Sequence, residues 1–208
     1  MSKARAEKIK VILFDVDGVL TDGKIFLLPA PAGTQDKAVR PEAAERADSG
    51  GYAIVSNEMI EAKAFHAHDG TAISLARLGG LKTGVITKRI SETVRLRARD
   101  LRLDYVYQGI ADKAGCFEQI CAEAGVQPEE VAFVGDDIID LPVMRRCGLA
   151  IAVANAREQV KDESHVVTDH GGGEGAARDA VEYILRAKGI LEDVVEQYLG
   201  ERTPKREA

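Results

Sequence analysis

Acidic residues gather in two short motifs of this 208-residue chain, DVDGVLTD and VGDDIID. The first motif contributes Asp15 and Asp17, and the second contributes Asp136, Asp137 and Asp140. Each motif follows an apolar run, where a continued strand would carry a core residue, and such departures from a local pattern are typical of functional sites. Five carboxylates side by side cannot all ionise without a counter-charge. Mg²⁺, a hard cation that prefers oxygen ligands and a substrate phosphate, is the neutraliser that fits this set.

A hydroxyl and an ammonium group occupy comparable positions. Thr87 ends an apolar run, and Lys113 comes shortly after another one, past Gln108 and Gly109. A solvated lysine at the start of a helix is the alternative for Lys113, but a helix N-terminus disfavours a cation. A turn or a solvated surface pair is the alternative for an isolated D-x-D motif. Because acidic motifs follow two separate runs, we favour a functional site.

The elements that must position these groups alternate in type along the chain. Apolar or β-rich runs lie at residues 10–14, 84–87, 105–107, 131–134, 149–153 and 166–168, and helical patterns lie at 70–78, 91–101, 113–124, 141–147 and 175–187. This alternation predicts an α/β fold with a doubly wound parallel sheet and crossover helices. Ligands of such sheets bind beyond the carboxyl ends of the strands, which is where the motifs fall.

One region interrupts the alternation. Residues 23–28 and 52–56 have the composition of strands, and 61–68 are a possible third. The stretch between the first two, rich in Ala, Pro, Gly and charge, is interpreted either as a mobile surface loop or as the flexible tip of a β-hairpin. We therefore predict one domain over residues 1–200, with a hairpin and flexible insertion at about 23–57 and no separate cap domain. Residues 201–208 are predicted to be a disordered tail.

Composition excludes several classes of function. The net charge is −6 and the isoelectric point about 5.4, which argues against a nucleic-acid or anionic-membrane surface. Aromatic residues make up 5% and Trp is absent, so base-stacking platforms are not expected. No apolar run approaches the ~18–20 residues that span a bilayer. The three cysteines form no C-x-x-C pair and are predicted to be buried thiols of a cytoplasmic protein.

Two weaker patterns have ordinary interpretations. His66 and His68 would share a strand face and could bind a transition metal, but no third ligand accompanies them, and a solvated strand face is favoured. The glycine-rich stretch GGGEGA at residues 171–176 matches a dinucleotide fingerprint loosely, although it lies in the last β–α unit. We interpret it as a flexible turn that could lend backbone N–H groups to a neighbouring site.

The four motifs DVDGVLTD, Thr87, Lys113 and GDDIID resemble those of the haloacid dehalogenase superfamily of phosphatases. More narrowly, the chain resembles the capless 3-deoxy-D-manno-octulosonate 8-phosphate phosphatases. The stretches that carry this second resemblance are GVLTDGKI, the F-x-x-x-DG of residues 65–70, YQG, VGDDIIDLPVM and GGGEGAARDAVEYIL. It covers residues from about 10 to 189, apart from 29–57.

The resemblance implies a Rossmann-like fold and a mechanism. With an ordinary pKa near ~4, Asp15 would be ionised at neutral pH and would attack phosphorus to form an aspartyl-phosphate. Asp17 would protonate the leaving alcohol and later take a proton from water. Asp15, the Asp17 backbone carbonyl and Asp136 would hold Mg²⁺. Asp137 and Asp140 would orient metal-bound water or the lysine ammonium.

The same resemblance implies how the substrate is held. Thr87 would donate to a phosphate oxygen, and Lys113 would offset the charge of phosphate and nucleophile. Other residues expected to bind the substrate are Lys88, Arg89, His68 and Asp69. Three features depart from the family pattern: Lys88 replaces a glycine, His68 stands where arginine is common, and the 29–57 region is longer than usual.

The expected activity is Mg²⁺-dependent hydrolysis of 3-deoxy-D-manno-octulosonate 8-phosphate by a homotetramer whose hairpins cover neighbouring sites. The alternatives are a phosphatase for a related nonulosonate 9-phosphate, a catalytically weak regulatory subunit with the same fold, and a phosphotransferase. Intact Asp15, Asp17 and Lys113 argue against the regulatory subunit.

Overall fold

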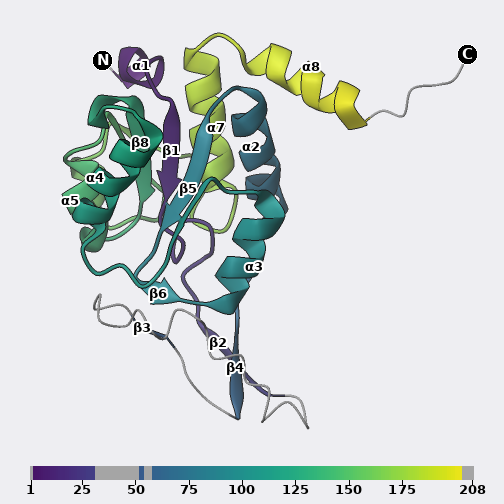
Figure 1. Ribbon diagram of the computed structural model, residues 1–208, viewed down its shortest axis with the longest axis vertical. Coiled ribbons are helices and arrows are strands. Elements are labelled where there is room, and N and C mark those ends of the chain that lie inside the picture. The colour runs from purple at the N-terminus through teal and green to yellow at the C-terminus, as the bar shows by residue number, and fades with distance from the viewer. Residues whose placement is uncertain (1, 31–51, 54–57, 203–208) are drawn as a thin grey trace, which may run out of the picture.

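The computed structural model of the chain describes residues 2–30, 52–53 and 58–202 (Figure 1). Its centre is a six-stranded parallel sheet in the order β10-β9-β8-β1-β5-β7. The strands are β1 (Val11–Phe14), β5 (Lys82–Ile86), β7 (Tyr105–Tyr107), β8 (Val131–Gly135), β9 (Leu149–Ala152) and β10 (Val166–Val167). Every residue of β1, β8 and β9 is buried, as expected for parallel strands covered on both faces.

Helices cover both faces of this sheet, so the predicted doubly wound α/β fold is confirmed (Figure 1). The helices are α1 (Ser2–Ala6), α2 (Ala67–Leu78), α3 (Glu92–Leu101), α4 (Lys113–Ala124), α5 (Leu141–Met144), α6 (Glu158–Asp162), α7 (Ala176–Ala187) and α8 (Leu191–Arg202). Short 3₁₀ turns lie at Pro128–Glu130 and Ile138–Asp140. Helix α4 ends on Gly125 in the left-handed region, as its position after the helical pattern predicts.

Helix α8 was not predicted, although its sequence carries a signal. Leu191 and Val194 are buried in the main core, and Val195 and Tyr198 pack against it. Their spacing places them on one face of a helix. Because α8 continues to Arg202, the predicted disordered tail starts too early, and residues 203–208 lie outside the described residues.

The excursion after β1 is a hairpin, but not the predicted one. Strand β2 (Phe26–Pro29) pairs antiparallel with β4 (Met59–Ala62), so the second strand is 59–62 rather than 52–56. Strand β3 (Tyr52–Ala53) pairs instead in parallel with β6 (Arg89–Ile90), which follows β5 closely in the chain (Figure 1). Strand composition alone does not determine which strand pairs with which. A short strand can pair with any free strand edge that the connecting chain brings close to it. Residues 31–51 and 54–57 of the predicted insertion lie outside the described residues.

The possible strand at 61–68 is also wrong over most of its length, because β4 ends at Ala62 and α2 begins at Ala67. Within the described part of the chain, none of the helices combines the length and apolar character that a membrane span requires. Beside the main sheet the described residues add two small two-stranded sheets, β2–β4 and β3–β6, and they contain no separate cap domain.

Candidate active site

Asp15 is fixed at the end of β1 by groups on both of its carboxylate oxygens. Its backbone N–H continues the strand pairing by donating to Val134 O at 3.0 Å. The Val16 N–H donates to Asp15 Oδ1 at 2.6 Å, and Lys113 Nζ lies 2.9 Å from Oδ2. Asp15 is 4% exposed, so it is an almost fully buried carboxylate with a defined orientation.

Lys113 links the two acidic motifs. It is the first residue of α4, a helix capped by the Asp112 carboxylate, which accepts from the Gly115 N–H. Its Nζ donates to Asp140 Oδ1 at 2.7 Å and makes the 2.9 Å contact with Asp15. A buried ammonium between two buried carboxylates satisfies the rule that interior charges are paired.

Asp140 and Asp136 have different environments. Both oxygens of Asp140 are engaged, since Oδ2 accepts from the backbone N–H groups of Asp136 and Asp137 at 3.0 and 3.3 Å. Asp136 Oδ1, in contrast, is buried and has no hydrogen-bond partner among the described residues. The exposed Asp137 accepts from the Ile138 N–H at 2.8 Å and caps the following turn. Asp137 therefore has a local structural contact, whereas Asp136 has an oxygen available for a ligand.

Oxygen atoms of Asp15, Asp136 and Asp140 lie within 4.8 Å of one another, and we call these three residues the acid cluster. Burial raises the pKa of Asp15 to about 7, against the opposing charge of Lys113. Burial, with the charges of Asp140 and Asp15, raises the pKa of Asp136 to about 8. Burial alone would lower the pKa of Lys113, but Asp15 and Asp140 raise it overall.

The expectation of an ordinary pKa for Asp15 is therefore wrong for the protein without a metal ion, because burial disfavours the charged form. One ammonium does not offset three carboxylates. A divalent cation at the acid cluster would favour the ionised carboxylates, so the residues present fit a hard metal ion.

A close approach of two loops shapes this site. Gly18 has φ +93°, and a Cβ atom there would lie 2.1 Å from Asp136 Oδ2. A Cβ atom on Gly172 would lie 1.7 Å from Gly18 O, and the Gly173 N–H donates to Val19 O at 2.9 Å. The GGGEGA stretch thus supports the loop that carries Asp15 and Asp17.

The phosphate-side residues lie after β5. Thr87 is buried, and its N–H donates to Tyr107 O at 2.9 Å. Its Oγ1 accepts from the Arg89 N–H at 3.4 Å, so the short loop through Lys88 folds back on the hydroxyl. Strands β1 and β5 pair in parallel, which places Thr87 at the same sheet edge as Asp15.

His68 and Asp69 lie in the first turn of α2, so the shared strand face predicted for His66 and His68 is wrong. His66 caps the helix by accepting from the His68 N–H at 3.3 Å, and the two rings meet edge to face at 4.7 Å. Asp69 is buried, and its Oδ1 accepts from the Arg178 N–H at 3.1 Å. Burial raises its pKa. Asp69 therefore connects α2 to α7.

Two charged residues beside Asp17 were not predicted. Lys63 donates to Asp17 Oδ1 and lies 2.9 Å from Glu61 Oε1. Arg89 closes the set, with Nη2 3.0 Å from Glu61 Oε2 and Nε 3.7 Å from Asp17 Oδ2. The available signal was the two-residue spacing of Glu61 and Lys63, which places both side chains on one side of an extended segment.

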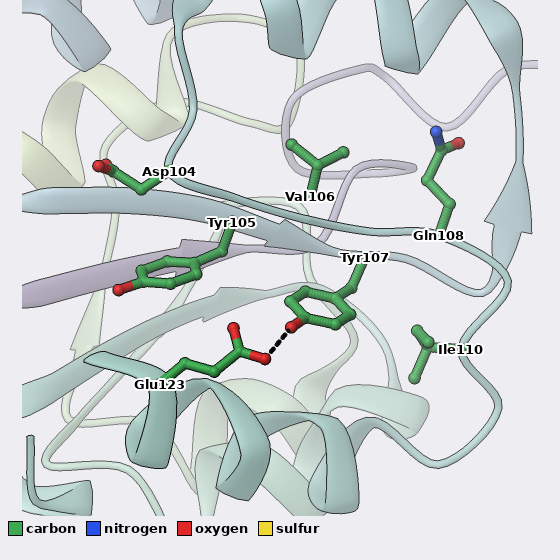
Figure 2. Close-up of a pocket in the computed structure, with 7 residues that line it drawn as sticks. All are labelled: Asp104, Tyr105, Val106, Tyr107, Gln108, Ile110 and Glu123. Atoms are coloured by element: carbon green, nitrogen blue, oxygen red, sulfur yellow. Dashed lines mark hydrogen bonds between the residues drawn. The ribbon is translucent and has the colours of Figure 1, made fainter. Parts of the chain in front are cut away.

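A cavity of about 350 Å³ lies away from these groups, at the open edge of strand β7 (Figure 2). Tyr107 donates to Glu123 Oε1 at 2.6 Å across it. Its lining residues are Asp104, Tyr105, Val106, Tyr107, Gln108, Ile110 and Glu123. None of them belongs to the acid cluster, so we locate the site by its chemistry and not by this cavity.

Comparisons with known proteins agree with this geometry. A family model of haloacid dehalogenase-like hydrolases matches residues 88–178. The 3-deoxy-D-manno-octulosonate 8-phosphate phosphatase KdsC of Escherichia coli K12 is 33% identical over 190 residues, which are 91% of this chain and 86% of that protein.

Solved structures of such enzymes are also similar. The 3-deoxy-D-manno-octulosonate 8-phosphate phosphatase of Yersinia pestis is 32% identical, with a TM-score of 0.76 over 92% of this chain and 88% of that one. The enzyme of Moraxella catarrhalis, solved in complex with a magnesium ion, a phosphate ion and KDO, is 28% identical. Its TM-score is 0.77 over 94% of this chain and 97% of that one.

The parallel sheet, the acid cluster and these matches define a haloacid dehalogenase-like hydrolase. Within that class, the chain belongs to the family of 3-deoxy-D-manno-octulosonate 8-phosphate phosphatases, KdsC. It is a phosphoric monoester hydrolase, and the resemblance drawn from its motifs is confirmed.

Proposed function

We propose that this protein is a Mg²⁺-dependent phosphatase that converts 3-deoxy-D-manno-octulosonate 8-phosphate to 3-deoxy-D-manno-octulosonate and phosphate. The observation that carries the proposal is the buried chain Asp15–Lys113–Asp140, with the unpartnered Asp136 oxygen beside it. The names of the relatives support the sugar-acid substrate.

Asp15 acts as the nucleophile in this proposal. The Val16 N–H and the Lys113 ammonium fix its two oxygens, so the attacking group is oriented before the substrate arrives. Attack on phosphorus forms a bond to Asp15 and releases the sugar oxygen, which leaves an aspartyl-phosphate. Thr87 donates to a phosphate oxygen, and Lys113 offsets the charge shared by phosphate and Asp15.

Asp17 moves the protons. It protonates the departing sugar oxygen and then takes a proton from the water that hydrolyses the aspartyl-phosphate. Its place two residues after Asp15, on the loop that Gly172 and Gly173 support, keeps the two carboxylates beside one substrate.

Asp15, Asp136 and the backbone carbonyl of Asp17 would hold Mg²⁺. Asp140 is a poorer candidate, since Lys113 and two backbone N–H groups already engage both of its oxygens. When bound, the cation would supply charge stabilisation to the transferring phosphoryl group. Asp140 would keep its role of positioning Lys113.

The test is phosphate release from a panel of sugar phosphates, with Mg²⁺ and after exhaustive chelation. We expect 3-deoxy-D-manno-octulosonate 8-phosphate to give the highest kcat/KM, EDTA to abolish the activity, and Mg²⁺ to restore it. A higher kcat/KM for a nonulosonate 9-phosphate would replace the substrate, and transfer to an added alcohol would indicate a phosphotransferase. Full activity after chelation would contradict the metal site.

We further propose a homotetramer that works in the cytoplasm, where the three free, buried thiols stay reduced. The hairpin supports the assembly, because four successive residues of it are 43–50% exposed and apolar, and Ile60 opposite them is 44% exposed. The four are Ile25, Phe26, Leu27 and Leu28. An isolated two-stranded hairpin is marginal in water, so copies of the chain are its natural cover.

The double substitution Phe26→Asp and Leu28→Asp is expected to convert the tetramer to a monomer, because it places charges on the apolar face. Light scattering of the wild type, the double variant and a Leu199→Asp control measures this. Leu199 is 53% exposed on α8, which lies at the opposite end of the molecule from the hairpin (Figure 1), so its variant should remain a tetramer. A wild-type monomer of 22.4 kDa with full activity would contradict the proposal.

A further inference from the structure

The return strand of the hairpin and the residues that follow it bring two charged side chains to the loop that carries Asp17. Glu61 and Lys63 meet Asp17 and Arg89 there, and acidic and basic side chains alternate around a closed set that we call the Asp17 ring. Its contacts are Lys63 Nζ with Asp17 Oδ1, Lys63 Nζ with Glu61 Oε1 at 2.9 Å, Arg89 Nη2 with Glu61 Oε2 at 3.0 Å, and Arg89 Nε with Asp17 Oδ2 at 3.7 Å.

Three of the four side chains in the ring are largely shielded from solvent, and that of Asp17 is 21% exposed. The side chain of Lys63 is 0% exposed, and those of Glu61 and Arg89 are 10% and 9% exposed. Buried charges are costly unless each is paired, and breaking one pair leaves an uncompensated charge. Lys63 and Arg89 each lie beside two carboxylates. Lys63 hydrogen-bonds Asp17 and Arg89 hydrogen-bonds Glu61, whereas the other two contacts are ion pairs without a hydrogen bond. Since each cation meets both Asp17 and Glu61, the ring restricts the orientation of Asp17.

The two carboxyl groups of the first motif, Asp15 and Asp17, therefore contact different basic side chains. Lys113 faces Asp15, whereas Lys63 and Arg89 face Asp17. Among the described residues, Glu61 makes no hydrogen bond or ion pair with the acid cluster, and its backbone carbonyl accepts from Thr93 Oγ1 at 3.3 Å. Its contacts hold the two cations in place and connect the hairpin to α3.

We propose that Glu61 and Lys63 are positioning residues for proton transfer: they hold Asp17 where it reaches the leaving oxygen of the substrate. This inference rests on the proposed function, in which Asp17 is the general acid. This role concerns the chemistry within one subunit. It is separate from the proposed contact between the hairpins of neighbouring subunits.

The test compares kcat/KM of Lys63→Met for two leaving groups, since kcat/KM reports the steps up to aspartyl-phosphate formation. The substrates are the best sugar phosphate of the panel and p-nitrophenyl phosphate, whose phenolate leaves without protonation. General acid catalysis contributes roughly 10²–10⁴-fold, so we expect a loss of at least about 10²-fold for the sugar phosphate. For the aryl phosphate we expect less than about threefold.

Three further variants sharpen the comparison. Glu61→Gln should give the same selective loss and keeps the test available if Lys63→Met fails to fold. Lys63→Arg should recover part of the sugar-phosphate activity. Lys82→Met is the matched control, because Lys82 lies at the opposite end of β5 and contacts the Tyr105 hydroxyl, so neither substrate should be affected.

An Asp17→Asn background separates positioning from direct binding of the sugar. There, Lys63→Met should change kcat/KM by less than about threefold, because no general acid remains to be positioned. Additive losses, or equal losses for both substrates in the wild-type background, would overturn the inference. If the wild type hydrolysed p-nitrophenyl phosphate but no sugar phosphate, the proposed function itself would fail, and the ring would lose its assigned role with it.

Discussion

Replacement of Asp15 by asparagine is expected to remove phosphatase turnover almost completely while the fold is retained. An amide is a poor nucleophile, and phosphate-monoester hydrolysis without an enzyme is extremely slow. The substitution keeps the shape of the side chain and the Val16 N–H donor. It also removes a carboxylate whose pKa burial raises to about 7, so little stability should be lost.

Phosphate release measures the turnover, and acid-quenched enzyme measures covalently bound phosphate. Asp15→Asn should trap no phosphate, whereas Asp17→Asn should lose most turnover and retain phosphate on Asp15. Asp179→Asn is a suitable control, because Asp179, on α7, accepts from the His170 N–H and makes no hydrogen bond or ion pair with the acid cluster within the described part of the chain. If Asp15→Asn kept a tenth of the wild-type activity, the covalent mechanism would be wrong.

The side chains whose positions the sequence predicted best are those at strand ends, and their catalytic roles stay a prediction. Asp15, Thr87 and Asp136 each interrupt an apolar run that has to be buried, and parallel strands bring such interruptions to one edge. Lys113 was predicted to lie beside other charges because a cation at a helix start is unfavourable without them, and the structure places it between Asp15 and Asp140. In each case, one residue that departs from its local sequence pattern, together with the parallel sheet topology, was enough to predict its position.

The Asp17 ring could not be found in this way. Glu61 lies on β4, and Lys63 follows the last residue of that strand. The partner strand, β2, is separated from β4 by a long insertion, so the proximity of both residues to Asp17 depends on hairpin register. Register is set by long-range pairing that composition does not encode, which is also why 52–56 was assigned to the hairpin. Arg89 was expected to bind substrate, and its contact with Glu61 places it in the ring.

Replacement of Lys113 by methionine is expected to destabilise the metal-free protein by about 3–5 kcal/mol at pH 8, in addition to abolishing turnover. Methionine fills the same space but leaves Asp15 and Asp140 without their ammonium. Exposed ion pairs contribute much less, so Arg145→Met, which breaks the contact with Glu163, should cost about 1 kcal/mol or less. Urea unfolding in EDTA measures both variants.

The pH dependence of the Lys113→Met loss distinguishes an electrostatic effect from a packing defect. Because the folded pKa of Asp15 lies above its unfolded value, the folded state binds the extra proton, and stability falls as pH rises towards about 7 in the wild type. Without Lys113 that pKa rises further, since the ammonium was lowering it. Above pH 7 the contribution of Asp15 to the stability of the wild type no longer changes with pH. In the variant, the free energy of unfolding should still fall there, by up to ~1.4 kcal/mol per pH unit for one proton.

The loss should consequently be smaller at pH 6 than at pH 8, with a remainder at pH 6 from the broken contact with Asp140. A loss that is the same at both pH values would mean that methionine merely packs badly beside Phe133, over whose ring Lys113 Nζ lies at 6.0 Å. Addition of Mg²⁺ should reduce the loss at pH 8 more than at pH 6, because a divalent cation at Asp15 and Asp136 replaces part of the missing charge and binds the deprotonated carboxylates. In that outcome Lys113 and the metal ion offset the same buried charge from two sides, and both are needed to keep Asp15 ionised for attack.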